Sequence, residues 1–249
     1  MNSTTKKRRY PDISRGNAAI IGGLALLIMA IIAPIADLSI FQKLIVNGDA
    51  AKTVMNIIAS ETSFRLGIFL FVIVLLLDII VAWALYVFLK PINKSLSLLA
   101  AWLRIVYTAI LGIAISYLFS VLNLLNAPDY INAFQNDQLN ALVMISLKSF
   151  RSVWEFGLAI FGFHLLLVGY LVFKAAYMKK VLGILVIIAG LGYIIDSFGR
   201  LISTEYNITV GMFTFIGEVI LLFWLLFKGR KEKQREKTKS SNSTLSTGH

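Results

Sequence analysis

The chain contains no cysteine and only two histidines among its 249 residues. The lack of cysteine excludes disulfides, thiolate metal sites and a cysteine nucleophile. A histidine metal site needs several ligands at helical spacing, and the only histidine besides His164 is the terminal His249. HExxH, GxSxG and Walker-type glycine patterns are also missing. The sequence therefore predicts no metal and no cofactor, and an enzyme is the less favoured class of protein.

Charged residues are scarce too, at 15% of the chain, whereas hydrophobic residues make up 58%. A soluble domain carries about a quarter charged residues, so this composition indicates a protein whose solvent is lipid. The net charge of +11 could indicate nucleic-acid binding, but the basic residues gather at the two termini and in short turns between apolar runs. That arrangement is typical of orientation signals in membrane proteins, so the predicted partner is the lipid bilayer and not nucleic acid.

Six apolar stretches are long enough to cross a bilayer, which takes about 20 helical residues. They cover residues 18–36, 66–89, 96–125, 153–173, 181–202 and 210–227. The predicted fold is an all-α membrane protein, with a bundle of six transmembrane helices over residues 18–228. The first stretch follows four basic residues, as in a signal peptide. It is longer than a signal-peptide core and lacks a clean cleavage site, so we expect an uncleaved anchor.

Basic residues favour one orientation of this bundle. They are concentrated at residues 6–15, in the second and fourth turns and at residues 228–239. The remaining loops hold only Lys43, Lys52, Arg65, Lys148, Arg151 and Arg200. The positive-inside rule then places both termini in the cytoplasm. We expect residues 1–17 to be a basic cytoplasmic N-terminus and residues 229–249 a basic, disordered cytoplasmic tail.

The longer loops after the first and third spans carry signals for short amphipathic helices on the outer surface. Asp49 is a candidate N-cap for residues 50–60, and Asp137 is one for residues 138–150. The second of these helices could run straight into the fourth span. Glycines such as Gly190 and Gly192 in the fifth span are expected to allow close helix packing.

Ionisable residues inside spanning helices are costly, so each needs a reason. The candidates for a polar cavity are Asp78, Arg104, Glu155, His164, Asp196, Arg200 and Glu218. Asp196 and Arg200 are four residues apart and are expected to form an ion pair on one helix face. Asp78 and Arg104 lie on consecutive antiparallel helices, and the long Arg104 side chain could bridge the difference in depth.

These residues leave three hypotheses open. The acids outnumber the arginines, which favours a polar cavity, opening outward, that binds or transports a small molecule, cationic or proton-coupled. Alternatively, the same residues form ion pairs and hydrogen bonds that fix the packing of a non-catalytic regulator or assembly partner. An intramembrane enzyme acting on lipid is the third hypothesis, but no nucleophile or metal constellation is evident in the sequence.

Three stretches carry a family resemblance: FGFHLLLVGYLVFKA (161–175), LGILVIIAGLGYIIDSF (182–198) and GEVILLFWLLFKG (217–229). Together with FRLGIF (64–69) and LAAWLRIVYTAI (99–110), they resemble the DUF4386 family of bacterial membrane proteins. Where that family would have a proline shortly before the fifth helix, this chain has Met178-Lys179-Lys180. The resemblance implies a six-helix protein of the bacterial cytoplasmic membrane. It implies no activity, because the function of the family is unknown.

Overall fold

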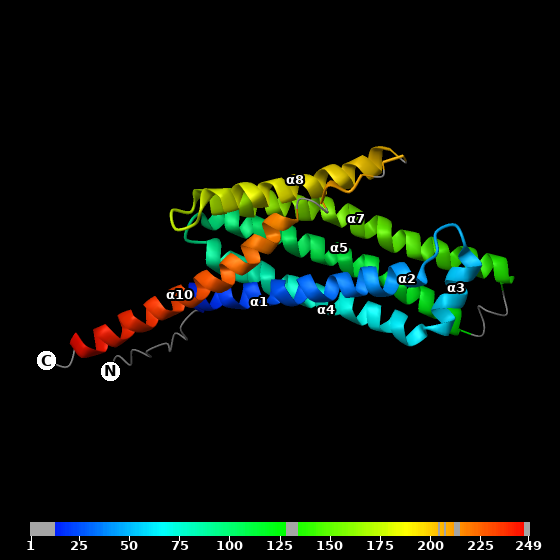
Figure 1. Cartoon of the computed structure of the whole chain (residues 1–249), viewed down its shortest axis with the longest axis horizontal. Helices are drawn as coiled ribbons and strands as arrows, with labels where there is room; N and C mark the ends of the chain where they lie inside the picture. Colours follow the sequence, from blue (N-terminus) through cyan, green and yellow to red (C-terminus); the bar gives the residue numbers. More distant parts are fainter. Residues whose placement is uncertain (1–12, 128–133, 204, 207, 212–214, 247–249) are drawn as a thin grey trace, which may run out of the picture.

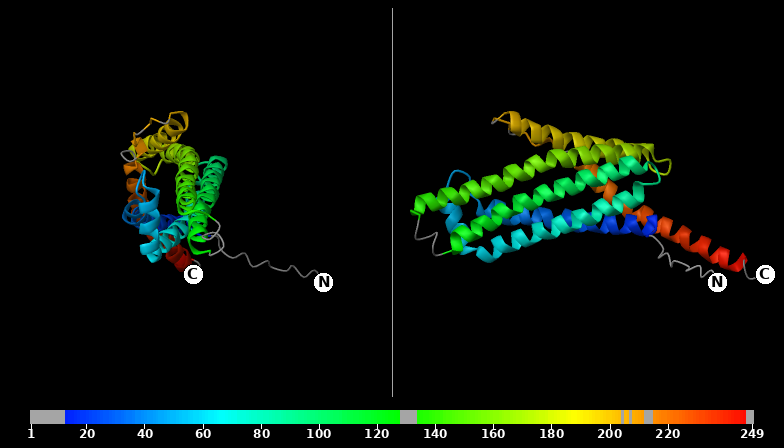
Figure 2. Two further views of the ribbon diagram at one scale, coloured as in Figure 1. Left: turned by 90° about the vertical axis from the view of Figure 1, so that its right-hand side faces the viewer. Right: turned by 180° about the vertical axis from the view of Figure 1, so that it is seen from behind.

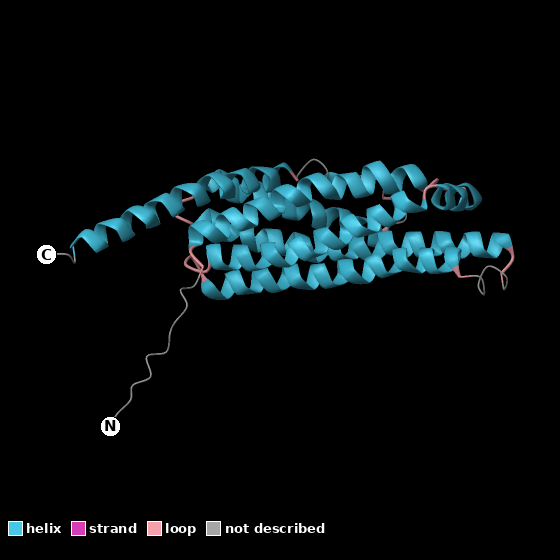
Figure 3. Cartoon of the chain, turned by 90° about the horizontal axis from the view of Figure 1, so that it is seen from below, coloured by secondary structure: helices cyan, strands magenta, loops and turns pink. Residues whose placement is uncertain are grey.

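The computed structural model describes residues 13–127, 134–203, 205–206, 208–211 and 215–246, with the backbone alone from residue 232 onward. Every regular element among these residues is helical (Figure 3). In chain order they are α1 (Arg15–Pro34), the π-helix η1 (Ile35–Phe41), α2 (Gln42–Leu44), α3 (Ala50–Ala59), α4 (Glu61–Leu89), α5 (Lys94–Asn126), α7 (Asn136–Lys174), α8 (Lys180–Ile202) and α10 (Ile216–Ser246).

Five helical segments are long and apolar enough to cross a membrane: residues 15–44, α4, α5, α7 and α8. Large apolar side chains point away from the bundle along these segments. Phe69, Trp102 and Phe156 are 58%, 62% and 58% exposed. Side chains of this kind are stable on an outer surface when that surface meets lipid. The prediction of an all-α membrane protein is thereby confirmed.

The predicted sixth span differs from the other five. Within the described residues a first helical turn starts at Val210, and α10 itself starts only at Ile216. The apolar part of α10 ends at Phe227, where a charged sequence follows. Five crossings are therefore supported by length and composition, and a sixth stays a prediction.

The helices form two groups, which are joined by the packing of α4 against α5 and of the last helix, α10, against α8. α7 packs against both α5 and α8, whereas α1 packs against both α4 and α10. Figure 1 shows α10 running obliquely from beside α8 to the start of α1. The start of α1 and the distal part of α10 lie at one end of the bundle, and α3 lies at the other, which we call the α3 end (Figure 2).

Glycines allow the close contact between α7 and α8. A Cβ atom built on Gly162 would lie 2.7 Å from the backbone oxygen of Gly190, and one on Gly169 would lie 2.8 Å from that of Gly183. Only glycine allows backbones to meet this closely. The expected packing role of Gly190 is thus seen in the structure, and α7 and α8 are joined along two turns of each helix.

The short helix after the first span is where the sequence predicts it. α3 begins after Asp49, whose side chain accepts a hydrogen bond from the Lys52 backbone N–H at 2.8 Å. The second predicted surface helix is the first part of α7, which continues without a break into the fourth span. The cap of α7 is Gln135 and not Asp137, because Gln135 and Gln138 form a reciprocal capping box.

The tail also differs from expectation. α10 continues as a helix to Ser246, through most of the segment expected to be disordered. Lysine, glutamate, arginine and glutamine dominate residues 228–237 and are all strong helix formers. A helix can therefore extend here without an apolar face. The predicted features of residues 1–12 and 247–249 lie outside the described residues.

Candidate functional site: an intramembrane cavity

Three buried polar residues from three helices form a network in the middle of the bundle. Arg104 of α5 makes an ion pair with Asp78 of α4, at 2.5 Å between Nη2 and Oδ1. Its Nη1 lies 3.3 Å from Nε2 of His164 on α7. The side chains of Asp78, Arg104 and His164 are almost completely buried. The predicted pairing of Asp78 with Arg104 is present, and His164 is added to it.

Hydrogen-bond geometry fixes the protonation of His164. Its Nδ1 lies 2.8 Å from the backbone oxygen of Ala100, which can only accept, so Nδ1 carries a proton and donates it. A guanidinium can only donate, so Nε2 accepts from Arg104. His164 is therefore neutral, and its hydrogen bond orients Arg104. The Phe161 ring also contacts the guanidinium, at 5.1 Å from its centroid.

A cavity of about 400 Å³ borders this network, and Asp78, Arg104 and Glu218 contribute to its wall. Aromatic side chains form much of the remainder: Phe71, Tyr107, Trp154, Phe161, Tyr193 and Phe215. Tyr107 and Trp154 are linked by a hydrogen bond of 3.3 Å from the indole nitrogen to the hydroxyl. The size lies within the range of about 300–1,000 Å³ typical of small-molecule pockets.

The cavity separates the facing surfaces of α1 and α10. On α1 it is lined at Leu26, Met29, Ala30 and Ala33, and on α10 at Glu218, Val219 and Leu222. These positions follow helical spacing, so each set is one face of its helix. The two helices meet at Gly23, where a Cβ atom would lie 2.8 Å from the Leu226 side chain. Toward the α3 end their surfaces part and enclose the cavity.

Several polar atoms of this cavity lack a hydrogen-bond partner among the described residues. They are both carboxylate oxygens of Asp78, Oε1 of Glu218 and Nε of Arg104. Oδ1 of Asp78 is in ionic contact with Arg104, so Oδ2 is the more isolated of its two oxygens. Buried polar atoms are usually satisfied in proteins, so each exception needs an explanation, such as a bound water, an ion or a functional role.

The other members of the predicted polar set lie elsewhere. Glu155 on α7 forms an ion pair with Arg200 on α8, at 3.0 Å from Oε1 to Nη1. Both line a separate pocket of about 220 Å³ between these helices. The predicted pairing of Asp196 with Arg200 is therefore wrong. A spacing of four residues permits a pair, but Arg200 faces α7, which offers a carboxylate, and Asp196 faces the segment that follows α8.

Asp196 holds the chain as it turns back along α8. Its Oδ1 accepts from the Tyr206 hydroxyl and the Val210 N–H, both at 2.8 Å, and its Oδ2 accepts from the Gly211 N–H at 2.7 Å. Burial and this hydrogen bond raise the pKa of the Tyr206 hydroxyl, which keeps it protonated and donating. The role of Asp196 is thus to cap the helical turn at Val210.

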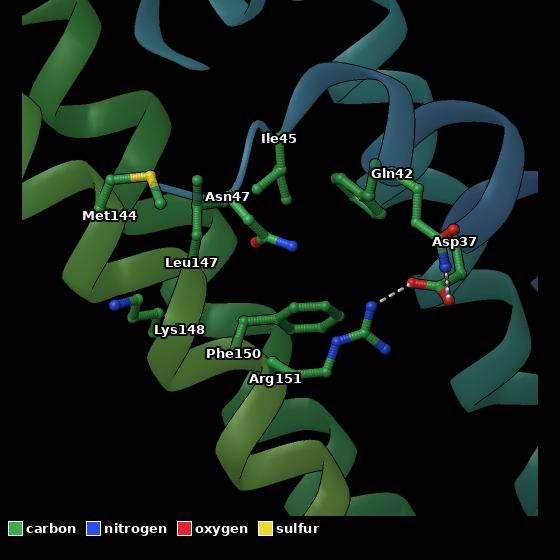
Figure 4. A pocket seen from close by; sticks show the side chains of 10 residues that line it. Asp37, Gln42, Ile45, Asn47, Met144, Leu147, Lys148, Phe150 and Arg151 are labelled. Carbon is green, nitrogen blue, oxygen red and sulfur yellow. Dashed lines mark hydrogen bonds and ion pairs between the residues drawn. The ribbon is translucent and has the colours of Figure 1, made fainter. Parts of the chain in front are cut away.

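A second pocket lies nearer the α3 end, between η1 and α7, and has a volume of about 460 Å³. Figure 4 shows Arg151 reaching across it to Asp37, with a 3.0 Å contact between Nη2 and Oδ1. Asp37 also accepts from the Gln42 side chain at 3.3 Å. Asp37 was not among the residues predicted from the sequence, although a carboxylate three residues after Pro34, at the end of an apolar run, was a usable signal. This ion pair is half exposed on its arginine side, unlike that of Asp78.

The aromatic lining was also missed. Tyr107, Trp154 and Tyr193 lie inside predicted spans, where a polar-tipped aromatic side chain needs a partner. The need for such a partner could have marked these three residues as part of the site. No group of three or more histidine or acidic side chains that could hold a metal ion occurs within the part of the chain that the structure describes.

Comparison with known proteins gives a family but no activity. An uncharacterized protein of Archaeoglobus fulgidus is 40% identical over 165 residues, which cover 66% of this chain and 83% of that protein. No solved structure matches the chain. The model of the family described as "Domain of unknown function (DUF4386)" matches residues 21–229, which contain the whole cavity and its Asp78–Arg104–His164 network. The chain therefore belongs to the DUF4386 family of uncharacterised proteins.

Proposed function

We propose that this protein binds a small, largely apolar molecule in the cavity between α1 and α10, as the binding step of a receptor or transporter within the membrane. The observation that carries this proposal is the cavity of about 400 Å³ with unpartnered buried carboxylate oxygens in its wall. We further propose that the protein lies in the cytoplasmic membrane with both termini inside, which makes the α3 end the outer end.

Access from the side, through the bilayer, is supported by the rim of the cavity. Ala30 and Pro34 of α1 are exposed, and Phe215 before α10 is 45% exposed. All three contribute to the cavity wall. Because this rim is apolar and faces outward between two helices, an apolar molecule dissolved in lipid meets it directly. This proposal differs from the outward-opening polar cavity expected from the sequence.

A purely structural role explains part of the network but not all of it. The ion pair of Asp78 with Arg104, oriented by His164, can be understood as packing of α4, α5 and α7. Glu218 forms no ion pair with a cation among the described residues. It nevertheless lies on the face of α10 that lines the cavity. A carboxylate that merely fixed packing would be expected to face a donor on each oxygen.

The test is saturable ligand binding to the protein in zwitterionic lipid nanodiscs. Three tritiated probes share one naphthyl body: 1-naphthylmethylamine, 1-naphthylmethanol and 1-naphthaleneacetic acid. We expect at least one probe to bind saturably above empty nanodiscs. The variant Ala33→Trp places an indole in the cavity and should abolish that binding. Ala109→Trp, on the exposed side of α5, is the matched control and should leave it intact.

Two results would contradict this proposal. One is that none of the three probes binds above empty nanodiscs. The other is that binding survives Ala33→Trp unchanged, which would place the bound probe elsewhere. Each variant is first compared with the parent by thermal unfolding, so that lost binding is not confused with lost folding.

A further inference from the structure

From the charges and unpartnered atoms of the cavity, we infer the class of its ligand: an amphiphilic organic cation, with a protonated amine that binds Glu218 and Asp78 and an apolar body that fills the aromatic part of the cavity. This inference rests on the proposed function, since it names what the same cavity binds. It is carried by three features of the wall: its charge, its hydrogen-bonding capacity and its aromatic surface.

The charges of the wall do not cancel. Asp78, Arg104 and Glu218 are its ionisable carboxylates and guanidinium among the described residues. Arg104 is in contact with Asp78, and its Nη1 donates to a neutral His164, so its charge is already offset. Glu218 remains without a cation. A bound ligand with one positive charge would complete two ion pairs in a site of low dielectric constant, where such pairs are strongest.

Hydrogen-bonding capacity points the same way. Apart from Oδ1 of Asp78, which contacts Arg104, the unpartnered atoms are two acceptor oxygens, Oδ2 of Asp78 and Oε1 of Glu218, against a single donor, Nε of Arg104. Asp78 is completely buried and is one of the residues that line the cavity, so a donor would approach its Oδ2 from the cavity side. A ligand that fits this wall must bring donors, and an ammonium group brings up to three.

The rest of the wall favours an apolar body of aromatic size. Phe71, Phe161 and Trp154 line the cavity together with the three charged residues. Tyr193 lies beside Glu218, with which it shares a hydrogen bond. Aromatic faces attract cations as well as apolar groups. Arg104 already makes such a contact with Phe161, at 5.1 Å from the ring centroid. A hydrophilic cation would leave most of this surface unmatched.

The competing ligand class is an organic anion that pairs with Arg104. Such a ligand would have to enter past Glu218 and displace or share the contact between Arg104 and Asp78. It would gain one donor, Nε, and leave two buried acceptor oxygens, Oδ2 of Asp78 and Oε1 of Glu218, unpartnered. Burial of unpartnered acceptors is costly, so the structure favours the cation.

The experiment compares the three naphthyl probes with one another in the same nanodiscs, at neutral pH. Since a charge-assisted hydrogen bond is about twice as strong as a neutral one, we expect the amine to bind at least about tenfold more tightly than the alcohol. The acid should bind most weakly. In Glu218→Gln the amine should lose about tenfold in affinity, and its advantage over the alcohol should disappear.

Two further variants serve as controls for the charge and for the location of the carboxylate. Glu218→Asp retains the charge and should retain the preference for the amine. Glu155→Gln removes a different intramembrane carboxylate, paired with Arg200 outside the cavity, and should leave all three affinities unchanged. Retained binding of the alcohol by Glu218→Gln shows that this variant is folded.

The outcomes separate the two proposals. Equal affinities of amine and alcohol, both lost in Ala33→Trp, would overturn the cation inference and leave the binding function standing. Tightest binding of the acid would overturn it as well. If no probe binds saturably, the proposed function itself fails, and the inference fails with it.

Discussion

At the scale of single residues, the bundle carries a buried ion pair whose geometry is completed by a neutral histidine. Asp78 and Arg104 are each no more than 2% exposed, and His164 holds the guanidinium from the opposite side. A buried pair stabilises little in itself, because both groups lose their hydration. Loss of one member is costly, because it leaves an unpaired charge in the interior.

We therefore predict a strongly non-additive response to mutation of this pair. Asp78→Leu and Arg104→Leu should each destabilise the protein by about 3–5 kcal/mol. The double variant Asp78→Leu/Arg104→Leu should recover most of that loss, because no unpaired charge remains. Thermal unfolding in detergent of the parent and the three variants provides the measurement. Additive effects would mean that the two side chains are not coupled.

The sequence predicted this pair but only part of its surroundings. Asp78 and Arg104 face each other because a short turn makes α4 and α5 antiparallel, a relation that can be inferred from chain order. His164 joins them from α7, and no sequence pattern relates the rotation of α7 to that of α5. The same uncertainty of rotation explains why Asp196 and Arg200, although on one face by spacing, find partners on different neighbours.

At the scale of helices, the α7–α8 pair depends on backbone contact. Cβ atoms built at Gly169 and Gly183 would lie within 2.8 Å of backbone atoms of the opposite helix. Gly112 of α5 is different, since a Cβ atom there would lie 3.3 Å from the end of the flexible Leu75 side chain. Gly169 and Gly112 both belong to apolar helices, and the residues around them in the sequence do not distinguish the two positions.

This contrast gives a matched pair of alanine variants. Gly169→Ala should force α7 and α8 apart and destabilise the protein by about 1–3 kcal/mol. Gly112→Ala should be close to neutral, because Leu75 can move and alanine is the better helix former. The unfolding midpoints of the two variants, measured in the same detergent, check the prediction. Equal shifts would indicate that the α7–α8 contact is looser than the structure shows.

Helix boundaries show a similar division between what the sequence could and could not predict. The lengths of the apolar stretches correctly predicted the spans seen in α4, α5 and α8, because a helix that crosses lipid needs a minimum number of apolar residues. The cap of the helical turn at Val210 was not foreseen. It depends on Asp196 satisfying the backbone N–H groups at Val210 and Gly211, a tertiary contact that leaves no mark in local composition.

At the scale of the whole molecule, the absence of cysteine makes orientation directly testable. We predict that Asn47→Cys, in the exposed turn before α3, reacts with a membrane-impermeant maleimide added to intact cells. Lys231→Cys, exposed on α10, should react only after the cells are permeabilised, because the positive-inside rule places it in the cytoplasm. Labelling of both sites from outside, or the reverse pattern, would contradict the proposed orientation.

The meeting of α1 with α10 also constrains how the protein is made. Gly23 and Leu226, which touch where the two helices cross, belong to the first and the last helices of the chain. Until the ribosome has released α10, the wall containing Asp78 and Arg104 faces lipid on the side that α10 later covers. The wall of the cavity is thus the last part of the bundle to be completed, and a chain truncated before Ile216 would lack the α10 part of that wall.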